Sequence, residues 1–510
     1  MRSVHRRDRR RLPTVGLVLA ASAAVTCTST AELFAPIEFP QPPEELAADP
    51  TGAVVLSNEA EIEFRPPAAE GEPGPREPYV VITQKVRALV TGKVHPSLSN
   101  WRVGRNVVSN VTRVDVARAR LARPDGTTVE VDGLAAGVGD RPIVLSLPEP
   151  QPGDLIDIVT QRTLTAVEAL PPWIFAAPAP CVESRLKVIA PEGWLVSIRR
   201  GQGNTVNRGA QIQQSIESGG RNGWVMVERN VRAVPLEPRA PHPQRMAPWA
   251  TAVLVSATLN GREVRYADSW ATVAARVETM LAKTMEIDEA SKQTMVRGLA
   301  KARLRSVHKA LKPRGDVAGL FGRPARPFAE IEVGTASAIE TVAVAAAAME
   351  GMVGKAYLAL VIPFEGAVLI DDQPGLYAMS SVVVAFPSDD EWTFADPACM
   401  TCPFGRVPMA VAGGRAVVLA DSGPMVVEIP MKIGEPNRRR LQFDWTLSVE
   451  GEVTGTLIAD LEGFVAQQVY RSITFAEDED SRKRFVGALL FGPNSGIRID
   501  ELIDEGLLSP

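Results

Sequence analysis

The stretch SAIETVAVAAAAMEGM, residues 337–352, decides the predicted fold class, because its composition is that of a helix buried on most sides. Gly351 is placed to end this helix. Three strand-like runs follow, namely KAYLALVIPF, SSVVVAFP and EWTFADP. Helical patterns followed by strands in this order predict an α+β domain that ends near residue 422.

Two helical patterns precede that stretch. Asp268 or Ser269 is placed to cap the first of them. Its apolar positions fall on one helical face: Trp270, Val273, Val277, Met280 and Leu281. The second pattern runs from Met295 to Leu311, and KPRG ends it.

The chain on either side of this region alternates with a period of two. ARLARPDGTTVEV, residues 119–131, predicts a hairpin with Pro-Asp-Gly at its tip. Similar runs predict a β-sandwich-like domain over residues 51–245, in which Trp173, Phe175 and Trp194 fill the core or its rim. After residue 422 the alternation returns, with a short helical patch near 480–490.

A chain of 510 residues is long for one hydrophobic core and predicts several domains. The predicted fold class is multidomain α+β, with an N-terminal β-sandwich-like domain, a central α+β domain and a small C-terminal β domain. The predicted boundaries are an export signal at 1–27, a Pro-rich tether at 28–50, and domains at 51–245, 246–422 and 423–510.

The N-terminus has the composition of an export signal. A block of six arginines precedes the short apolar run VGLVLAASAAVT, residues 15–26, which is too short to span a bilayer. Cys27 follows at once and is a candidate for lipidation, while cleavage near Ala31 is the alternative. Both predict an exported protein, periplasmic or associated with the outer membrane, with membrane anchoring if Cys27 is acylated. The net charge of −5 gives no reason to expect nucleic acid as a partner.

The middle of the chain resembles the bacterial transglutaminase-like superfamily, which has a papain-like fold. The likeness is carried by SW at 269–270, VGTASAIETVAVAAAAMEGMVGKAYLALV and EWTFADPACMTCPFGRVP, in that order. ARPDGTTVEV, LPEPQPGDLIDI and PCVESRLKVIAPEGW resemble the N-terminal β domain of unknown function that accompanies the family in large envelope proteins. The resemblance covers most of the mature chain.

The family's chemistry implies a cysteine at a helix start, a histidine on a following strand and an aspartate at the end of the next strand. Carried over, these positions fall on Ala336, on Ser381 (or Met379 or Ser380), and on Asp396. Only the aspartate is retained. The four histidines are His5, His95, His242 and His308, so no imidazole follows residue 308. The resemblance therefore implies a degenerate triad and a pseudoenzyme.

Cys399 and Cys402 admit several interpretations. A small structural disulfide, or pairing of one of them with Cys181, suits an exported protein. A redox motif needs a helix after the first thiol, yet PFGRVPMAVAGG continues as turn and strand. A zinc site needs four ligands, and the chain offers no second pair nearby, so we expect neither a metal nor a cofactor. A relocated nucleophile is the remaining alternative.

We therefore predict a binding or scaffolding module of the cell envelope, whose partner is an envelope protein or glycan. Trp270, Tyr377 and Trp392 are candidates to line its cleft. The alternative is a thiol-dependent hydrolase or acyltransferase that uses Cys399 or Cys402. A purely structural spacer is a third hypothesis and would show neither a pocket nor an exposed aromatic patch.

Overall fold

The computed structural model describes residues 33–503, apart from gaps. The longer gaps are 104–111, 135–142, 208–211, 235–240, 294–325, 332–337, 432–437, 470–477 and 492–497, and the others are one or two residues long. A short helix, α2 (Glu44–Ala47), precedes the first strand. Over the described residues, no helix has the length and the apolar composition to cross a membrane.

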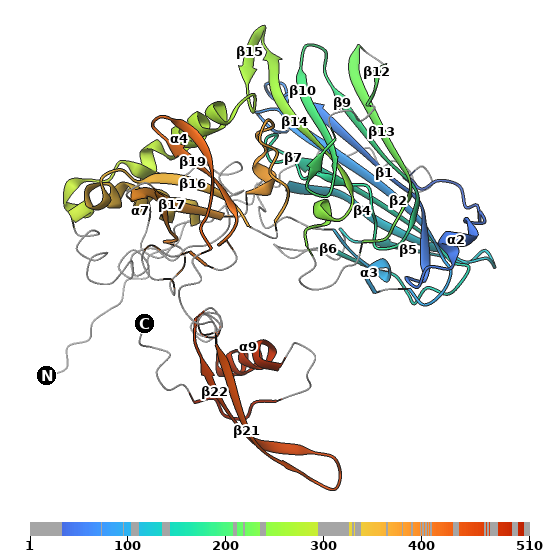
Figure 1. The fold of residues 1–510 in the computed structure, drawn as a ribbon. Helices are drawn as coiled ribbons and strands as arrows, with labels where there is room; N and C mark the ends of the chain where they lie inside the picture. Colours follow the sequence, from blue (N-terminus) through green and yellow to red (C-terminus); the bar gives the residue numbers. More distant parts are fainter. Residues whose placement is uncertain are drawn as a thin grey trace, which may run out of the picture.

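A sheet of eight strands, six of them at least ten residues long, dominates the N-terminal half (Figure 1). In spatial order its strands are β12 (Gln213–Glu217), β13 (Arg221–Val231), β9 (Cys181–Ala190), β1 (Ala53–Arg65), β2 (Tyr79–Val90), β7 (Leu155–Leu164), β4 (Thr112–Ala122) and β5 (Thr128–Asp132). Only the β1–β9 pair among them is parallel. The residues of one face alternate with those of the other, as the period-two runs predicted.

Two structures cover the inner face of this sheet. One is a second sheet of β11 (Thr205–Val206), β10 (Leu195–Gln202), β14 (Pro248–Leu259) and β15 (Arg262–Arg265), with β8 (Trp173–Ile174) paired to β14. The other includes the strand pair β3 (Asn100–Val103) and β6 (Ile143–Ser146) with the helix α3 (Pro96–Ser99). Each cover encloses its own apolar cluster against the large sheet.

The central part contains a five-stranded antiparallel sheet with two helices on one face. Its spatial order is β18 (Glu391–Ala395), β17 (Ser381–Ser388), β16 (Tyr357–Ile362), β19 (Arg415–Ala420) and β20 (Gly423–Glu428). The helices are α4 (Trp270–Met285) and α7 (Ala338–Val353), which pack on each other and share one cluster with the sheet. Loops cover the opposite face around Phe394, Val411 and Ile429.

The C-terminal part is a hairpin of β21 (Arg439–Leu447) and β22 (Val453–Leu461) with the helix α9 (Glu479–Phe491). Figure 1 shows these three elements as a group of their own. The helix lies where the sequence predicted a helical patch. It packs on one face of the hairpin around Val486 and Leu490.

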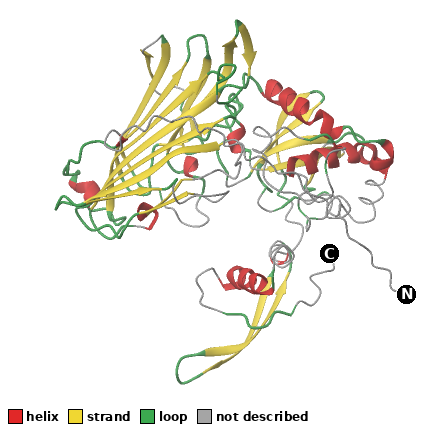
Figure 2. Ribbon diagram, turned by 180° about the vertical axis from the view of Figure 1, so that it is seen from behind, coloured by secondary structure: helices red, strands yellow, loops and turns green. Residues whose placement is uncertain are grey.

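The predicted multidomain α+β fold class, with a central transglutaminase-like α+β domain, is wrong. Where the structure describes the chain, strands account for 45% of it and helices for 18%. Figure 2 shows helix gathered mainly at the central sheet, while strands fill the rest. The two 16-residue helices form one layer on the central sheet, whereas the five strands of that sheet and the long N-terminal strands contribute many more residues.

The helix predicted after Asp268 is confirmed. Ser269 caps α4, since its Oγ accepts a hydrogen bond from the backbone N–H of Thr272 at 3.2 Å. The predicted helix at 295–311 lies outside the described residues. Phe175 and Trp194 are buried as predicted, and Trp173 lies at the rim of the same cluster.

A buried ion pair joins the N-terminal half to α4. Glu168 is only 3% exposed, and its carboxylate pairs with the Arg276 guanidinium of α4. The backbone carbonyl of Glu168 also accepts from the N–H of Leu376 at 3.0 Å. Burial raises the pKa of Glu168, and Arg276 acts in the opposite direction. The ion pair therefore allows a carboxylate to lie at this junction.

We expect Arg276→Met to lower the free energy of unfolding by about 3 kcal/mol at pH 8, because it leaves the Glu168 carboxylate buried and uncompensated. The folded-state pKa of Glu168 is raised above its ordinary value of 4.5, so this carboxyl favours the folded state below pH 4.5. That contribution is lost as the pH rises through the folded-state pKa. The loss in the variant should therefore be smaller at pH 4.5, as urea unfolding at both pH values would measure.

The matched control is Arg265→Met, which removes an exposed partner of Asp268 at 3.2 Å. This exposed pair should contribute less than about 0.5 kcal/mol. An equal loss for Arg276→Met at both pH values would show that the charge of Glu168 is not what Arg276 compensates.

Candidate functional site

The retained acid, Asp396, directly follows β18 at one end of the central sheet. Its side chain is buried, at 6% exposure. Its backbone carbonyl accepts from the N–H of Cys399 at 3.1 Å, and the carbonyl of Cys399 accepts from the N–H of Cys402 at 3.2 Å. The chain after Asp396 is therefore a series of tight turns, the role that an Asp-Pro pair commonly has.

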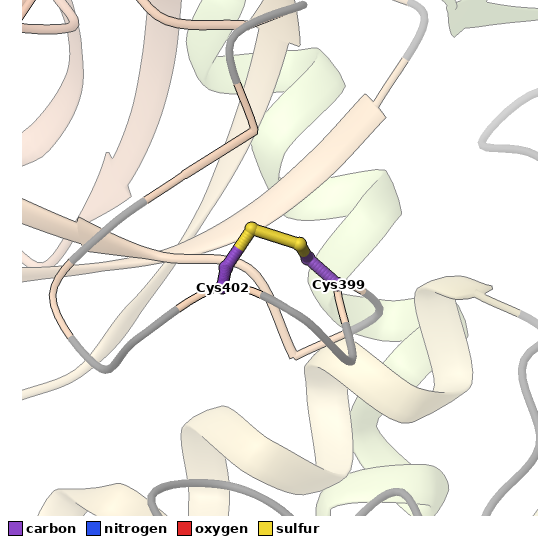
Figure 3. Close-up of a disulfide and its surroundings, with 2 residues drawn as sticks. All are labelled: Cys399 and Cys402. Atoms are coloured by element: carbon purple, nitrogen blue, oxygen red, sulfur yellow. A yellow bond between two sulfur atoms is a disulfide. The ribbon is translucent and has the colours of Figure 1, made fainter. Parts of the chain in front are cut away.

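A disulfide joins Cys399 and Cys402 across these turns, with their Cα atoms 5.4 Å apart (Figure 3). Cys402 is buried and Cys399 is partly buried. A sulfur in a disulfide is not a thiolate, so neither residue is a nucleophile in this state. The bond links two positions three residues apart and fixes the loop beside Asp396.

The third described cysteine, Cys181, is not paired with either of them. It is fully buried at the start of β9, and its thiol donates to the carbonyl of Glu183 at 3.2 Å. Burial raises the pKa of Cys181 to about 12. Such a thiol stays protonated at neutral pH and acts as a small apolar core residue.

The positions considered for the missing histidine lie on different faces of the central sheet. Ser381 opens β17 on the face of Val383 and Ala385, which is opposite to the helices. Met379 packs in the cluster that contains α7, and a thioether is not a proton acceptor for catalysis. Ser380 lies outside the described residues.

The register of the strands places Ser381 and Asp396 at the same end of the sheet. β17 and β18 are antiparallel with Val384 opposite Ala395, so the start of one strand neighbours the end of the other. Ala336, the position matching the nucleophile, lies outside the described residues, as do Cys27 and His308. The degenerate triad therefore stays a prediction, of which the structure places two members.

The three candidate aromatic residues do not line one cleft. Trp270 and Tyr377 pack on the helix side, where the indole N–H donates to the carbonyl of Asp371 and the phenol to that of Val368, both at 3.3 Å. Burial raises the pKa of Tyr377 to about 12. Trp392 packs on the opposite face, edge-on to Tyr357 with ring centroids 5.9 Å apart.

A cavity of about 390 Å³ lies between β10 and the segment around Asp372 and Gln373. Its polar groups already have partners. Arg199 pairs with Asp372 at 3.2 Å, and the Gln373 amide donates to the Ser197 carbonyl at 2.8 Å. These contacts hold two parts of the chain together. The side chains that form them are therefore already paired and are not available to a ligand.

A second cavity, of about 310 Å³, lies on the inner face of the eight-stranded sheet. Asn58, Gln84 and Arg162 line it from β1, β2 and β7. Sequence analysis did not single out these residues. The sequence does contain a signal for them, because all three are polar residues at strand positions whose side chains face the core, where apolar residues are the rule.

No group of three His, Cys, Asp or Glu side chains within the described ranges is arranged to hold a metal ion. His242 is the one described histidine, and its Nδ1 accepts from the N–H of Gln244 at 3.2 Å as a helix cap. Burial lowers the pKa of His242, which favours this neutral, accepting form.

No family model matches the chain. No curated protein matches it. A solved structure described as a "putative protease" from Parabacteroides distasonis is similar to it, with 14% sequence identity and a TM-score of 0.49 over 75% of this chain and 72% of the other. A likeness at this level assigns neither an activity nor a site.

We expect alkylation of the native, unreduced protein to leave Cys181, Cys399 and Cys402 unmodified. After mild reduction, the partly buried Cys399 should react, whereas Cys181 should react only on unfolding because it is fully buried and its pKa is about 12. Peptide mass spectrometry after labelling measures each site. Labelling of Cys399 or Cys402 without a reductant would instead favour the thiol-dependent enzyme.

Proposed function

We propose that this chain is an exported, non-catalytic relative of transglutaminase-like proteins that binds or scaffolds a protein partner in the bacterial cell envelope. Export is supported by the arginine block and the apolar run before Cys27. The relationship is supported by the order of the motifs from 269 to 408. Neither the partner nor the compartment follows from the fold itself.

The chemistry of the central part supports the non-catalytic role. A papain-like thiol needs an imidazole base, and the sequence has no histidine after residue 308. The disulfide occupies both thiols that lie near Asp396. A hydrolase or acyltransferase that uses Cys399 or Cys402 would first have to break this bond.

The observation that carries the binding role is an exposed apolar face on the C-terminal hairpin. The hairpin face consists of Phe443, Trp445, Leu447 and Val453, whose exposure lies between 44% and 69%. Leu447 lies opposite Val453, and alternation puts Phe443 and Trp445 on the same side. A soluble surface seldom gathers large apolar side chains in this way unless something binds there.

The hairpin face continues a surface that α9 already covers. Leu441, Ala459 and Leu461 lie in the cluster beneath the helix, and Phe443 at its edge contacts Phe491 with centroids 6.4 Å apart. Beyond that edge the apolar residues continue to Leu447, and they are exposed in the part of the chain that the structure describes. The helix therefore buries one end of the apolar strip, and the other end remains for a partner.

Trp445 is held in place for such a contact. Its ring packs edge-on against Phe443 with centroids 4.6 Å apart. It lies opposite Gly455, where an added Cβ would come within 2.6 Å of the Trp445 ring. The glycine thus lets the indole lie close to the neighbouring strand. An exposed aromatic pair with few free rotations is the kind of group that contributes most to protein interfaces.

We expect a photo-crosslinking amino acid at Leu447 to form a discrete adduct with a partner protein in the native cells, because this position is 69% exposed on the hairpin face. The matched control is the same amino acid at Asp444, which is exposed on the opposite face of β21. Gel analysis with mass spectrometry identifies the adduct, and cell fractionation shows its compartment.

An adduct from Leu447 alone, found in the envelope fraction, is the expected outcome. Adducts of the same kind from both positions would indicate non-specific contact. The absence of any adduct from Leu447 would contradict the hairpin face as a binding surface.

A further inference from the structure

A row of polar residues crosses the otherwise apolar inner face of the eight-stranded sheet. From β13 to β7, the polar row consists of Glu228, Ser184, Asn58, Gln84, Thr160 and Arg162. Ile158 and Leu164 flank the row on β7 in the same register, and they belong to the two different apolar clusters. The polar row therefore lies where the two covers of the sheet meet.

Most of the polar row is satisfied within the protein. Glu228 forms an ion pair with Arg200 of the covering sheet. The Asn58 amide donates to Ser184 Oγ at 3.4 Å, and the Gln84 amide donates to Asn58 Oδ1 at 3.2 Å. One end of the row thus has a partly buried carboxylate with its counter-charge.

Arg162, at the other end, has no such partner among the described residues. Its Nε is buried without a hydrogen bond, and no described carboxylate forms an ion pair with its guanidinium. Burial lowers the pKa of Arg162, with no opposing charge to offset it. The indole N–H of Trp173 is likewise buried without an acceptor. Buried donors without partners are rare and require an explanation.

Both orphan donors line the same cavity of about 310 Å³. Its remaining wall is mostly apolar and comes from the covers: Trp101, Pro171, Pro172, Ile174, Ala176, Ala177 and Pro178. A fixed cation and an N–H donor beside aromatic and proline surfaces match a ligand with one negative group and an apolar body.

We propose that this cavity is a binding site for a carboxylate carried on an apolar or aromatic body. A carboxylate is planar and accepts two parallel hydrogen bonds from one guanidinium, and the orphan Nε of Arg162 is one of the two donors it needs. Its single charge balances that of Arg162. A phosphate dianion would leave one negative charge without a partner in this partly enclosed site.

Trp173 supplies the second contact. Its indole N–H is the other orphan donor, and its ring forms part of the wall with Trp101. A free aromatic acid and the C-terminal carboxylate of a peptide present the same chemistry. The site goes beyond the function proposed above, because it would exist whether or not the central part is catalytic.

Calorimetric titration of the full chain tests the site with benzoate as the probe. Benzamide, which has the same shape without the charge, and inorganic phosphate are the comparison ligands. Gly-Phe, with a free or an amidated C-terminus, distinguishes a peptide source from a free acid. We expect benzoate to bind and to raise the thermal unfolding midpoint, while benzamide and phosphate do neither.

Arg162→Met should weaken benzoate binding by about 100-fold, because it removes the charged partner of a buried carboxylate. Trp173→Phe keeps the ring, removes the N–H and should weaken binding about fivefold. The control is Arg185→Met, which removes an exposed arginine from the outer face of β9 and should leave the affinity unchanged.

The proposal is overturned if neither benzoate nor the free-acid dipeptide binds, if Arg162→Met binds as well as the native protein, or if phosphate binds more tightly than benzoate. If Arg162→Met fails to fold, the Trp173→Phe measurement decides, and an unchanged affinity there contradicts the site. The crosslinking result at Leu447 does not affect any of these outcomes, so each of the two proposals can be contradicted independently of the other.

Discussion

The structure depends on the need to cover the inner face of a sheet whose central strands run to between ten and thirteen residues. Apolar residues on that face stabilise the fold only when other residues pack on them and exclude water. A single small sheet is too narrow to cover strands of this length. The chain meets the constraint with two covers, formed by β10 with β14 and by β3 with β6. Because there are two covers, they meet at a boundary on the sheet, and the polar row lies along this boundary.

The same covering sheet also positions the central part. Trp249 of β14 is fully buried against Val368 and Ile370, which lie before the central strand β17. Two buried amides fix the orientation across the contact, because the Gln244 side-chain carbonyl accepts from the N–H of Val368 at 2.9 Å and the Gln373 amide donates to the Ser197 carbonyl at 2.8 Å. An apolar contact alone would permit sliding. Two buried amides with defined partners specify one arrangement.

Local structure could be predicted from the sequence where it depends on neighbouring residues alone. Ser269 caps α4, and the alternating runs form strands, because capping and period-two burial are local effects. The fold class could not be predicted in the same way. Helical patterns are conspicuous in a sequence, yet the amount of strand depends on pairing between distant segments, such as β1 with β9.

The candidate site was only partly predictable for a similar reason. A motif locates Asp396 at a strand end, but the face on which Ser381 lies depends on the register of β17, and a shift of one residue reverses it. Trp270, Tyr377 and Trp392 are aromatic residues in or near the motifs of the central part, and the sheet separates them onto two faces. The positions of these residues in the sequence do not show on which face of the sheet each of them lies.

The polar row shows which sequence signal carries more weight. An aromatic residue in a predicted core is already explained by burial, so it says little about function. A charged residue in the apolar register of a strand has no such explanation, because its desolvation costs free energy that folding must offset. Glu228 is explained by Arg200. Arg162 at the far end has no counterpart among the described residues, and this difference is the ground for the carboxylate site proposed there.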